Sequence, residues 1–196
     1  ATELGWKDFS LVLFGSRKKV DATLISDSLL EEQEFVSSIN LSGLHRTNSE
    51  IAKKNSFEET IAGANLKYQK RNLRFGLASV FQGYDKTFNR SISPYNQFDF
   101  RGKSFMSHSF DYSFVLKNFS FFGESSIASY SNKMGHLHGV LIALDPRVSL
   151  SLLYRNYDRA YQTLYNNGFS EGSNTQNERG IYFGAKIKIS KSWTLN

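Results

Sequence analysis

The sequence predicts an all-β protein: an antiparallel, up-and-down transmembrane β-barrel of about ten strands. Three observations predict it. The 196 residues include 17 Phe and 10 Tyr but only 2 Pro, a composition that suits pleated strands. Short runs of alternating apolar and polar side chains follow one another along the chain. Short and long connections alternate between these runs, as in outer-membrane barrels with tight turns at one end and longer loops at the other.

Composition excludes several classes of protein. Mean hydropathy is -0.41, and no window approaches the ~20 apolar residues of a spanning helix. A barrel remains compatible with this value, because each strand offers lipid only every second residue. The absence of cysteine removes disulfides, zinc–thiolate clusters and thiol nucleophiles. The net charge of +6 is compatible with nucleic acid, acidic glycans or a phosphate-rich membrane surface, and does not choose among them.

Ten runs are predicted as strands, in pairs joined by short turns. They are residues 6–14 with 19–25, 59–68 with 73–84, 104–116 with 119–129, 138–144 with 148–157, and 181–190 with a run that begins at Ser192. The turns are "SRKK", "QKRN", Lys117-Asn118, Asp145-Pro146 and Ser190-Lys191. The other connections are longer: 26–58, 85–103, 130–137 and 158–180. Every tight turn is therefore expected at one end of the sheet.

Each run has an apolar and a polar face. In 73–84, Phe75 and Leu77 share one face, and Arg74 lies on the other. A charged residue that faces the middle of the bilayer costs about 2–4 kcal/mol. We therefore expect the apolar face to be the outer surface and the charged face to line the interior. The predicted lumen residues, in which the carboxylates balance the arginines, are Lys67, Arg74, Asp111, Glu124, Arg147, Arg155, Lys186 and Lys188.

A soluble β-barrel has the same alternation of apolar and polar residues, but its two faces are reversed. A lipocalin-like carrier puts its apolar face inward and its charges in water. Aromatic residues near strand ends favour the membrane interpretation, because they fit the girdles at a membrane interface. These residues are Trp6, Tyr68, Tyr84, Tyr154, Tyr157 and Trp193.

The connection at 27–57 predicts a two-helix insertion. In "DSLLEEQEFVSSI", Leu29, Leu30, Phe35 and Ile39 have helical spacing and acidic residues come early, where a helix favours them. Further on, Thr47 and Glu50 have the spacing of a capping box. The insertion would either lie across the lumen as a partial plug or form a surface hairpin.

Several blocks resemble a family of Bacteroidetes outer-membrane barrel proteins. They are "SGLHRTNSEIAKKNSFEETIAGANLKYQ", "PYNQFDFRGK", "NFSFFGE", "LDPRVSLSLLYRNYDRAYQTLYNNGFSEGSNTQNERGIYFGAKIK" and "SWTLN". Members are often described as helix-hairpin-helix proteins because of a motif nearer their N-terminus, and they continue for several strands beyond "SWTL". The resemblance implies that this chain is an internal part of a larger barrel, and it keeps nucleic-acid uptake open as a function.

Enzymatic groups are sparse. His136 and His138 alternate on one face near Ser131 and Glu124, but their spacing fits no nucleophile motif. Asp145 lies at the far end of the same run, more than ~20 Å from the histidines at 3.3 Å per residue, which excludes one metal site with all three. We expect no enzyme, no catalytic residue, no metal and no cofactor. The polar loop "NNGFSEGSNTQNERG" is interpreted as mobile filler, with glycan contact as the alternative.

The predicted function is an outer-membrane channel or envelope-assembly scaffold with a cationic lumen that favours anions. Residues 1–196 would form a single barrel domain or a barrel fragment in the outer membrane of a Gram-negative bacterium. The expected partners are the lipid bilayer and other envelope protein chains that complete the sheet, since unpaired strand edges cannot face lipid. The alternatives are a nucleic-acid uptake component and a soluble lipocalin-like carrier.

Overall fold

The computed structural model describes residues 1–27, 33–40, 42–89, 91–94, 96–162, 168–172, 175–189 and 194–195. It confirms the predicted all-β class, because the described residues form eleven strands of one sheet and one short helix. The elements are β1 (Thr2–Trp6), β2 (Phe9–Asp27), β3 (Gln33–Asn40), α1 (Asn48–Ala52), β4 (Phe57–Lys70), β5 (Leu73–Phe88), β6 (Gly102–Leu116), β7 (Phe119–Ala128), β8 (Lys133–Asp145), β9 (Val148–Tyr157), β10 (Glu178–Lys188) and β11 (Thr194–Leu195).

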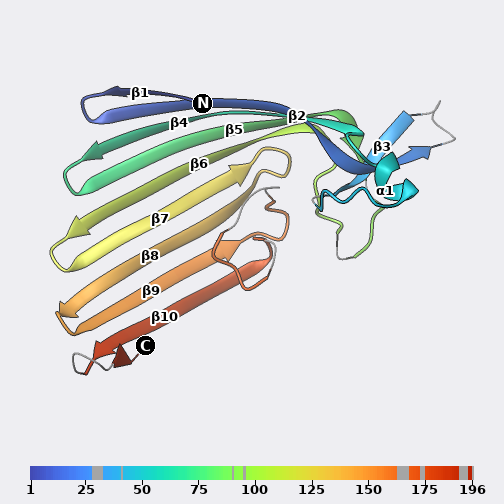
Figure 1. The fold of residues 1–196 in the computed structure, drawn as a ribbon. Coiled ribbons are helices and arrows are strands. Elements are labelled where there is room, and N and C mark those ends of the chain that lie inside the picture. Colours follow the sequence, from blue (N-terminus) through green and yellow to red (C-terminus); the bar gives the residue numbers. More distant parts are fainter. Residues whose placement is uncertain are drawn as a thin grey trace.

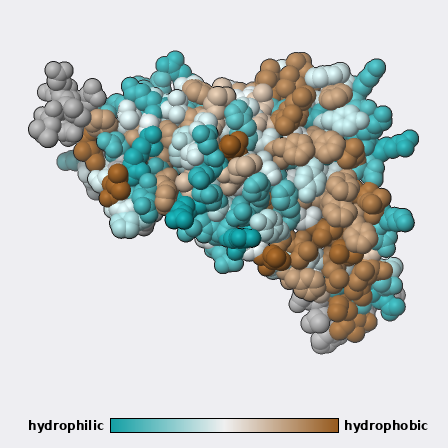
Figure 2. All heavy atoms as spheres, turned by 180° about the vertical axis from the view of Figure 1, so that it is seen from behind, coloured by the Kyte–Doolittle hydropathy of each residue, from teal (hydrophilic) through white to brown (hydrophobic). Residues whose placement is uncertain are grey.

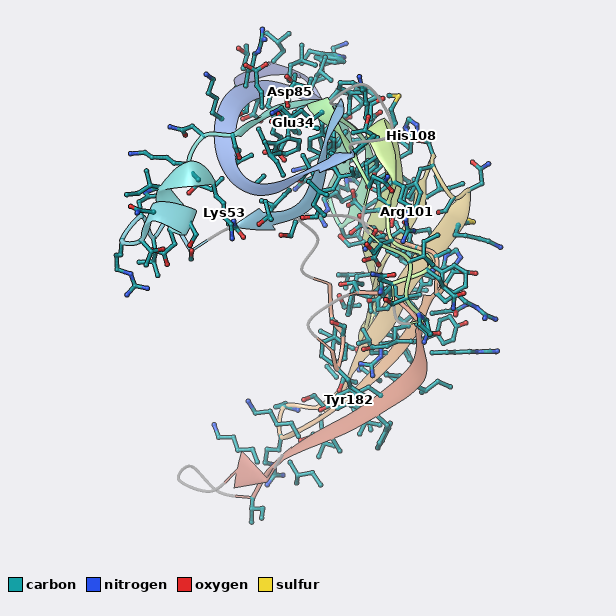
Figure 3. All side chains as sticks on the ribbon, turned by 90° about the vertical axis from the view of Figure 1, so that its right-hand side faces the viewer. Glu34, Lys53, Asp85, Arg101, His108 and Tyr182 are labelled. Atoms are coloured by element: carbon teal, nitrogen blue, oxygen red, sulfur yellow. The ribbon has the colours of Figure 1, made fainter. Side chains whose placement is uncertain are left out.

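The sheet is an up-and-down meander in which neighbours along the chain pair antiparallel, from β1 through β2, β4 and β5 to β11. The tight turns lie together at one end, on the left of Figure 1, and the other connections lie at the opposite end. Viewed along the strands, the sheet curves into an open C (Figure 3). Within the described residues the edge strands β1 and β11 are not paired with each other, so the barrel is not closed.

A small closed ring of strands forms where the long connections lie. Beyond Val20, which pairs with Phe57, β2 leaves β4 and continues alongside β3. β3 in turn runs parallel to the end of β5, where Val36 pairs with Phe88. The order β2–β4–β5–β3 therefore closes on itself at this end, as the upper part of Figure 3 shows.

The buried core fills this ring on the concave side of the sheet. It consists of Ala22, Val36, Phe57, Tyr84, Phe100 and Phe105. Phe57 stacks on Tyr84 with ring centroids 5.2 Å apart, and Phe100 lies 4.7 Å from Phe105. Such aromatic pairs add about 0.5–1.5 kcal/mol each to the burial of their area. The enclosed core is thus confined to the long-connection end of the molecule.

The predicted two-helix insertion is wrong for its first helix. Gln33–Asn40 is a strand, in which Val36 is fully buried in the core and pairs with the extension of β2. Burial of Val36 and pairing with β2 outweigh the helical spacing of Phe35 and Ile39. Leu29 and Leu30 lie outside the described residues. The predicted capping box is confirmed at Thr47 and Glu50, where it begins the short α1.

The predicted turn "SRKK" is also wrong, because it lies inside the continuous β2. Its cations meet carboxylates on β4: Arg17 lies 2.6 Å from Glu58, and Lys18 lies 3.3 Å from Glu59. The turn before β2 is instead Lys7-Asp8, inside the predicted first strand. Lys7 has a φ of 50°, and the first residues of the next two tight turns, Arg71 and Lys117, share this left-handed conformation with φ of 52° and 53°.

The later strands agree with the predicted runs. β9 has the predicted bounds, and β6, β7 and β10 begin or end within three residues of them. β8 begins earlier than predicted, at Lys133, so the connection expected at 130–137 shrinks to a turn at 129–132. The next connection at this end of the sheet, at 158–177, is longer. The two ends of the sheet are therefore distinct, although one connection on the long side is itself short.

Candidate functional site: the two faces of the curved sheet

The convex face of the sheet carries an exposed apolar band. The register places Leu66, Leu77 and Phe110 in one row across β4, β5 and β6, and Leu77 is 56% exposed. Figure 2 shows this face, with a broad hydrophobic area over the part nearer the tight turns and hydrophilic residues on either side. Its exposed large side chains are Leu4, Trp6, Phe9, Leu13, Phe75, Leu77, Phe81, Met106, Phe110, Leu116, Phe119, Met134, Leu144, Leu152, Ile181, Phe183 and Ile187.

Aromatic rings gather on this face beside the tight turns. Trp6 stacks on Phe9 at 5.8 Å, and Phe9 lies 4.9 Å from Tyr68. Further along, Phe114 stacks on Phe121 at 4.8 Å. These rings lie next to the basic turn residues, the arrangement of an interfacial girdle.

Not every predicted girdle residue lies on the convex face. Tyr84 and Tyr157 are buried, at 7% and 5% exposure, on the concave face. Their prediction was wrong because nearness to a strand end does not specify a face. Tyr154 lies on the convex face beside Ile181, and Trp193 lies outside the described residues.

The concave face brings most of the predicted lumen residues into one row. The register runs from Lys67 across Gly76 to Asp111, then Glu124, Leu137 and Arg155. Lys186 and Lys188 lie on the same face, closer to the tight turns and exposed. The last two residues of the predicted set are Arg74, on the concave face, and Arg147, in a tight turn.

Arg74 lies on the concave face, two residues along β5 from Gly76 toward the tight turn, whereas Arg147 lies in the turn between β8 and β9. Arg74 forms an ion pair of 3.5 Å with Asp111, whose carboxylate covers Gly76. A Cβ at Gly76 would lie 1.9 Å from the Asp111 carboxylate oxygen, so this glycine makes room for the ion pair. Arg147 pairs with Asp145 at 3.7 Å in solvent.

Arg155 is the buried charge of the concave face, with its side chain 11% exposed. Its Nε lies 3.2 Å from Glu178, and its guanidinium also binds Glu171. Glu178 further accepts the backbone N–H groups of Glu171 and Gly172. The described part of the loop that was predicted to be mobile filler is thereby fixed to the sheet.

The described residues of the connection at 158–177 lie on the concave face, inside the curve of Figure 3. Tyr161 shares a hydrogen bond with Ser126 of β7, and Tyr157 donates to the Phe169 carbonyl at 3.1 Å. Gln162 accepts the N–H of Phe100 at 2.8 Å, which ties this connection to the one before β6. We call residues 158–162, 168–172 and 175–177 the strap.

Tyr130 holds the strap from the turn at 129–132. Its hydroxyl donates to the Ala160 carbonyl at 3.0 Å. Burial, as the main cause, raises the pKa of Tyr130 to about 12. The hydroxyl therefore stays protonated and remains a donor at every physiological pH.

A half-open pocket of about 260 Å³ lies between the strap and the sheet. Its polar lining includes Gln82, Ser107, Ser109, Glu124, Ser126 and Thr175, and its other lining residues include Ala78, Val80, Leu137, Tyr157 and Tyr161. A Cβ on Gly135 would lie 2.7 Å from the Tyr161 ring. Glycine at this position therefore lets the strap approach the sheet.

The two histidines share the convex face, as predicted, but their expected companions do not join them. Glu124 points to the concave face, opposite Leu137, and Ser131 accepts the Lys133 N–H in the turn. Ser125 instead lies between the rings, 3.0 Å from His136 Nδ1 and 3.4 Å from His138 Nε2. No nucleophile, base and orienter are therefore assembled from the four residues considered.

Sequence reasoning missed the strap contacts. Glu178 continues the alternation of β10, so extending the predicted strand by three residues would have placed it opposite Tyr157 and beside Arg155. Tyr161 and Glu171 carry no such signal, because they lie in an irregular segment without periodicity. The alternation of β7 predicts the face on which Ser125 lies. It does not predict that Ser125 lies between two histidines of β8.

None of the described helices is long and apolar enough to cross a membrane. The described residues contain no group of three or more His, Cys, Asp or Glu side chains that could hold a metal ion. Comparison of the chain with protein-family models, with curated proteins and with solved structures gives no match. The two faces of the sheet and their charges are therefore the basis for a functional proposal.

Proposed function

We propose that the chain crosses the outer membrane of a Gram-negative bacterium as part of an up-and-down β-barrel and serves as a channel or envelope-assembly scaffold. The observation that carries the proposal is the opposition of the two faces. Large apolar side chains are exposed on the convex face, and the charged row lies on the concave face. A membrane protein needs this polarity, because its outside contacts hydrocarbon and its inside contacts water.

The length of the apolar band along a strand supports a bilayer. On the convex side of β5 the band extends over nine residues, from Leu73 to Phe81. A tilted transmembrane β-strand needs about 9–11 residues to cross the hydrocarbon core. Charged residues bound the band at both ends, with Arg71 in the tight turn and Asp85 beyond Gly83.

The same polarity weighs against a soluble carrier. Leu77 and Phe183 are 56% and 64% exposed, and full burial of such a side chain is worth about 1.5–3 kcal/mol. A carrier would gain this free energy by turning these residues inward around its ligand. In this chain the inward residues include Arg74 and Arg155 with their carboxylate partners.

Paired arginines leave the lysines as the source of interior charge. No ion pair among the described residues includes Lys67, Lys186 or Lys188. All three lie on the concave face toward the tight turns. The interior would therefore attract anions most strongly near this mouth.

Nucleic-acid uptake is a second candidate, supported by the charge of the tight-turn end. Lys7, Arg71, Lys117 and Arg147 lie in successive tight turns of this end. A rim of cations can bind phosphate backbones independently of sequence. This candidate predicts duplex DNA binding that falls steeply as salt rises, and that weakens when these four residues become Gln.

Flotation with lipid vesicles followed by planar-bilayer conductance tests the main proposal. We expect the protein to float with vesicles and resist extraction by carbonate, and a pore to favour anions. The triple variant K67Q/K186Q/K188Q should lose this preference, whereas K54Q, which changes an exposed lysine next to α1, should keep it. Stable solution behaviour without detergent would contradict the membrane assignment, and stable insertion without conductance would favour the scaffold role.

A further inference from the structure

A row of hydrogen-bonding side chains interrupts the convex face where its apolar band ends. The register places Ser125, His136, Asn156 and Arg179 side by side across β7, β8, β9 and β10. One step toward the tight turns, the band begins with Tyr154 and Ile181. The row thus lies near the border between the apolar band and the long connections, with the pair Ile127 and Met134 beyond it on β7 and β8.

The groups of this row have complementary hydrogen-bonding capacities. The Ser125 hydroxyl lies 3.0 Å from His136 Nδ1, which leaves Nε2 of that ring available for a ligand. Directly opposite residues of an antiparallel sheet have Cβ atoms about 4.5–5.5 Å apart. His136, Asn156 and Arg179 can therefore reach one small group together.

The row holds a cation that forms no ion pair among the described residues. Arg179 is exposed, and no ion pair of the described chain includes it. Its neighbour Glu178 points to the other face and binds Arg155. Asp158 accepts the Ala160 N–H at 2.9 Å. The charge of Arg179 is thus available to an anion.

We infer that His136, Asn156 and Arg179 bind the phosphate of a lipid headgroup. The inference rests on the proposed membrane function, because that function places the row at the level of the headgroups. Guanidinium groups hold phosphate through paired, charge-assisted hydrogen bonds, and an imidazole and an amide add donors beside it. The adjoining band, with Tyr154 and Ile181, would contact the acyl chains of the same lipid.

The two histidines of β8 differ in how far their ring nitrogens are hydrogen-bonded within the protein. His138, one step further into the apolar band than His136, is bonded to the Tyr112 hydroxyl at 3.2 Å. Its polar atoms are therefore satisfied within the protein, as a residue near hydrocarbon requires. His136 keeps a free ring nitrogen because its row lies at the headgroups, where a ligand or water can complete its hydrogen bonds.

Native mass spectrometry of the full chain, released from nanodiscs, tests the inference. The probes are dioleoyl phosphatidic acid and, as a phosphate-free lipid, digalactosyl diacylglycerol. We expect retained phosphatidic-acid adducts that fall by about tenfold or more in H136Q/R179Q, given the strength of charge-assisted bonds to phosphate. K117Q, which removes an exposed cation at the opposite end, should retain them.

Further arms separate the sources of phosphate and the two proposals. Inorganic phosphate at millimolar concentration should displace little lipid, and equal competition by free phosphate would overturn the lipid assignment. Equal adducts in wild type and H136Q/R179Q, or equal retention of the galactolipid, would also overturn it. These results leave the proposed function intact if the protein inserts into nanodiscs, whereas failure to insert contradicts both proposals.

Discussion

Single residues decide how closely the strands and the strap approach one another. Gly63 on β4 lies under the ring of Phe14, and a Cβ there would lie 2.5 Å from that ring and 2.8 Å from the Ser79 carbonyl. Gly5 has no atom within 4 Å of the equivalent position. Glycine is thus required by contact at one position and tolerated at the other.

We expect Gly63→Ala to lower the free energy of unfolding by about 1–3 kcal/mol, because overpacking displaces Phe14 or the neighbouring strand. Urea unfolding from detergent micelles measures the change through the midpoint. Gly5→Ala is the matched control and should stay within about 0.5 kcal/mol of wild type. Equal midpoints for the two variants would contradict the packing described at Gly63.

The face of the sheet on which each strand residue lies was predictable to a large extent. Alternation alone placed Lys67, Arg74, Asp111, Glu124, Arg155, Lys186 and Lys188 on one face. The predicted balance of carboxylates and arginines is confirmed for Arg74 and Asp111, but no ion pair among the described residues joins Glu124 to an arginine. Glu178 lies beside Arg155 through the register of β9 and β10, whereas Glu171 reaches Arg155 only because the strap folds over the sheet, and no local pattern encodes that approach.

Among the elements, β2 contains a charged segment that was predicted as a turn but is part of the strand. The cations at 17–19 face carboxylates at 58 and 59 in antiparallel register. The charges alone resemble a polar turn, and only the complementary pair of segments indicates a strand. β3 lacked even this signal, because Val36 is buried by a core assembled from distant residues.

The short helix α1 should be sensitive to acid. The Arg46 backbone N–H, as the main cause, holds the pKa of Glu50 below its ordinary value of 4.5. A depressed pKa in the folded state stabilises above the ordinary pKa, and this contribution is lost as pH falls through the folded value. We expect amide protection factors of α1 to decrease as pH falls below about 4.5.

The variant E50Q separates the carboxylate from the fold. It should weaken α1 at neutral pH and remove the acid dependence of its protection. Hydrogen exchange with mass spectrometry gives both values, with β6 as an internal reference. An unchanged pH profile in E50Q would show that another group is responsible.

The strap depends on one charged side chain, Arg155, for its attachment to the sheet. In R155Q, Glu178 loses its buried partner, and removal of one member of such a pair costs about 3 kcal/mol. We expect the segment from Gly168 to Gly180 to be cleaved faster by proteinase K. R147Q, whose arginine pairs with Asp145 in solvent, should leave the cleavage rate unchanged. Equal rates in R155Q and wild type would refute the anchoring role of Arg155.

At the scale of the whole molecule, the sheet combines a closed end with an open wall. The ring of β2, β4, β5 and β3 lies at the buried core defined by Phe57, Tyr84 and their neighbours, and the remaining strands form a curved wall. The wall is stabilised mainly by strand pairing and by cross-strand side-chain contacts. Its convex side is exposed, and the proposed bilayer would cover it.

The most direct test is the depth and orientation of single positions in a bilayer. Because the chain has no cysteine, F75C and L152C on the convex face and S109C and S151C on the concave face each introduce a unique thiol for an environment-sensitive fluorophore. In vesicles with brominated acyl chains, we expect strong quenching at 75 and 152, and in water-soluble quencher strong quenching at 109 and 151. The reverse pattern, with the convex positions in water, would contradict the account of the two faces.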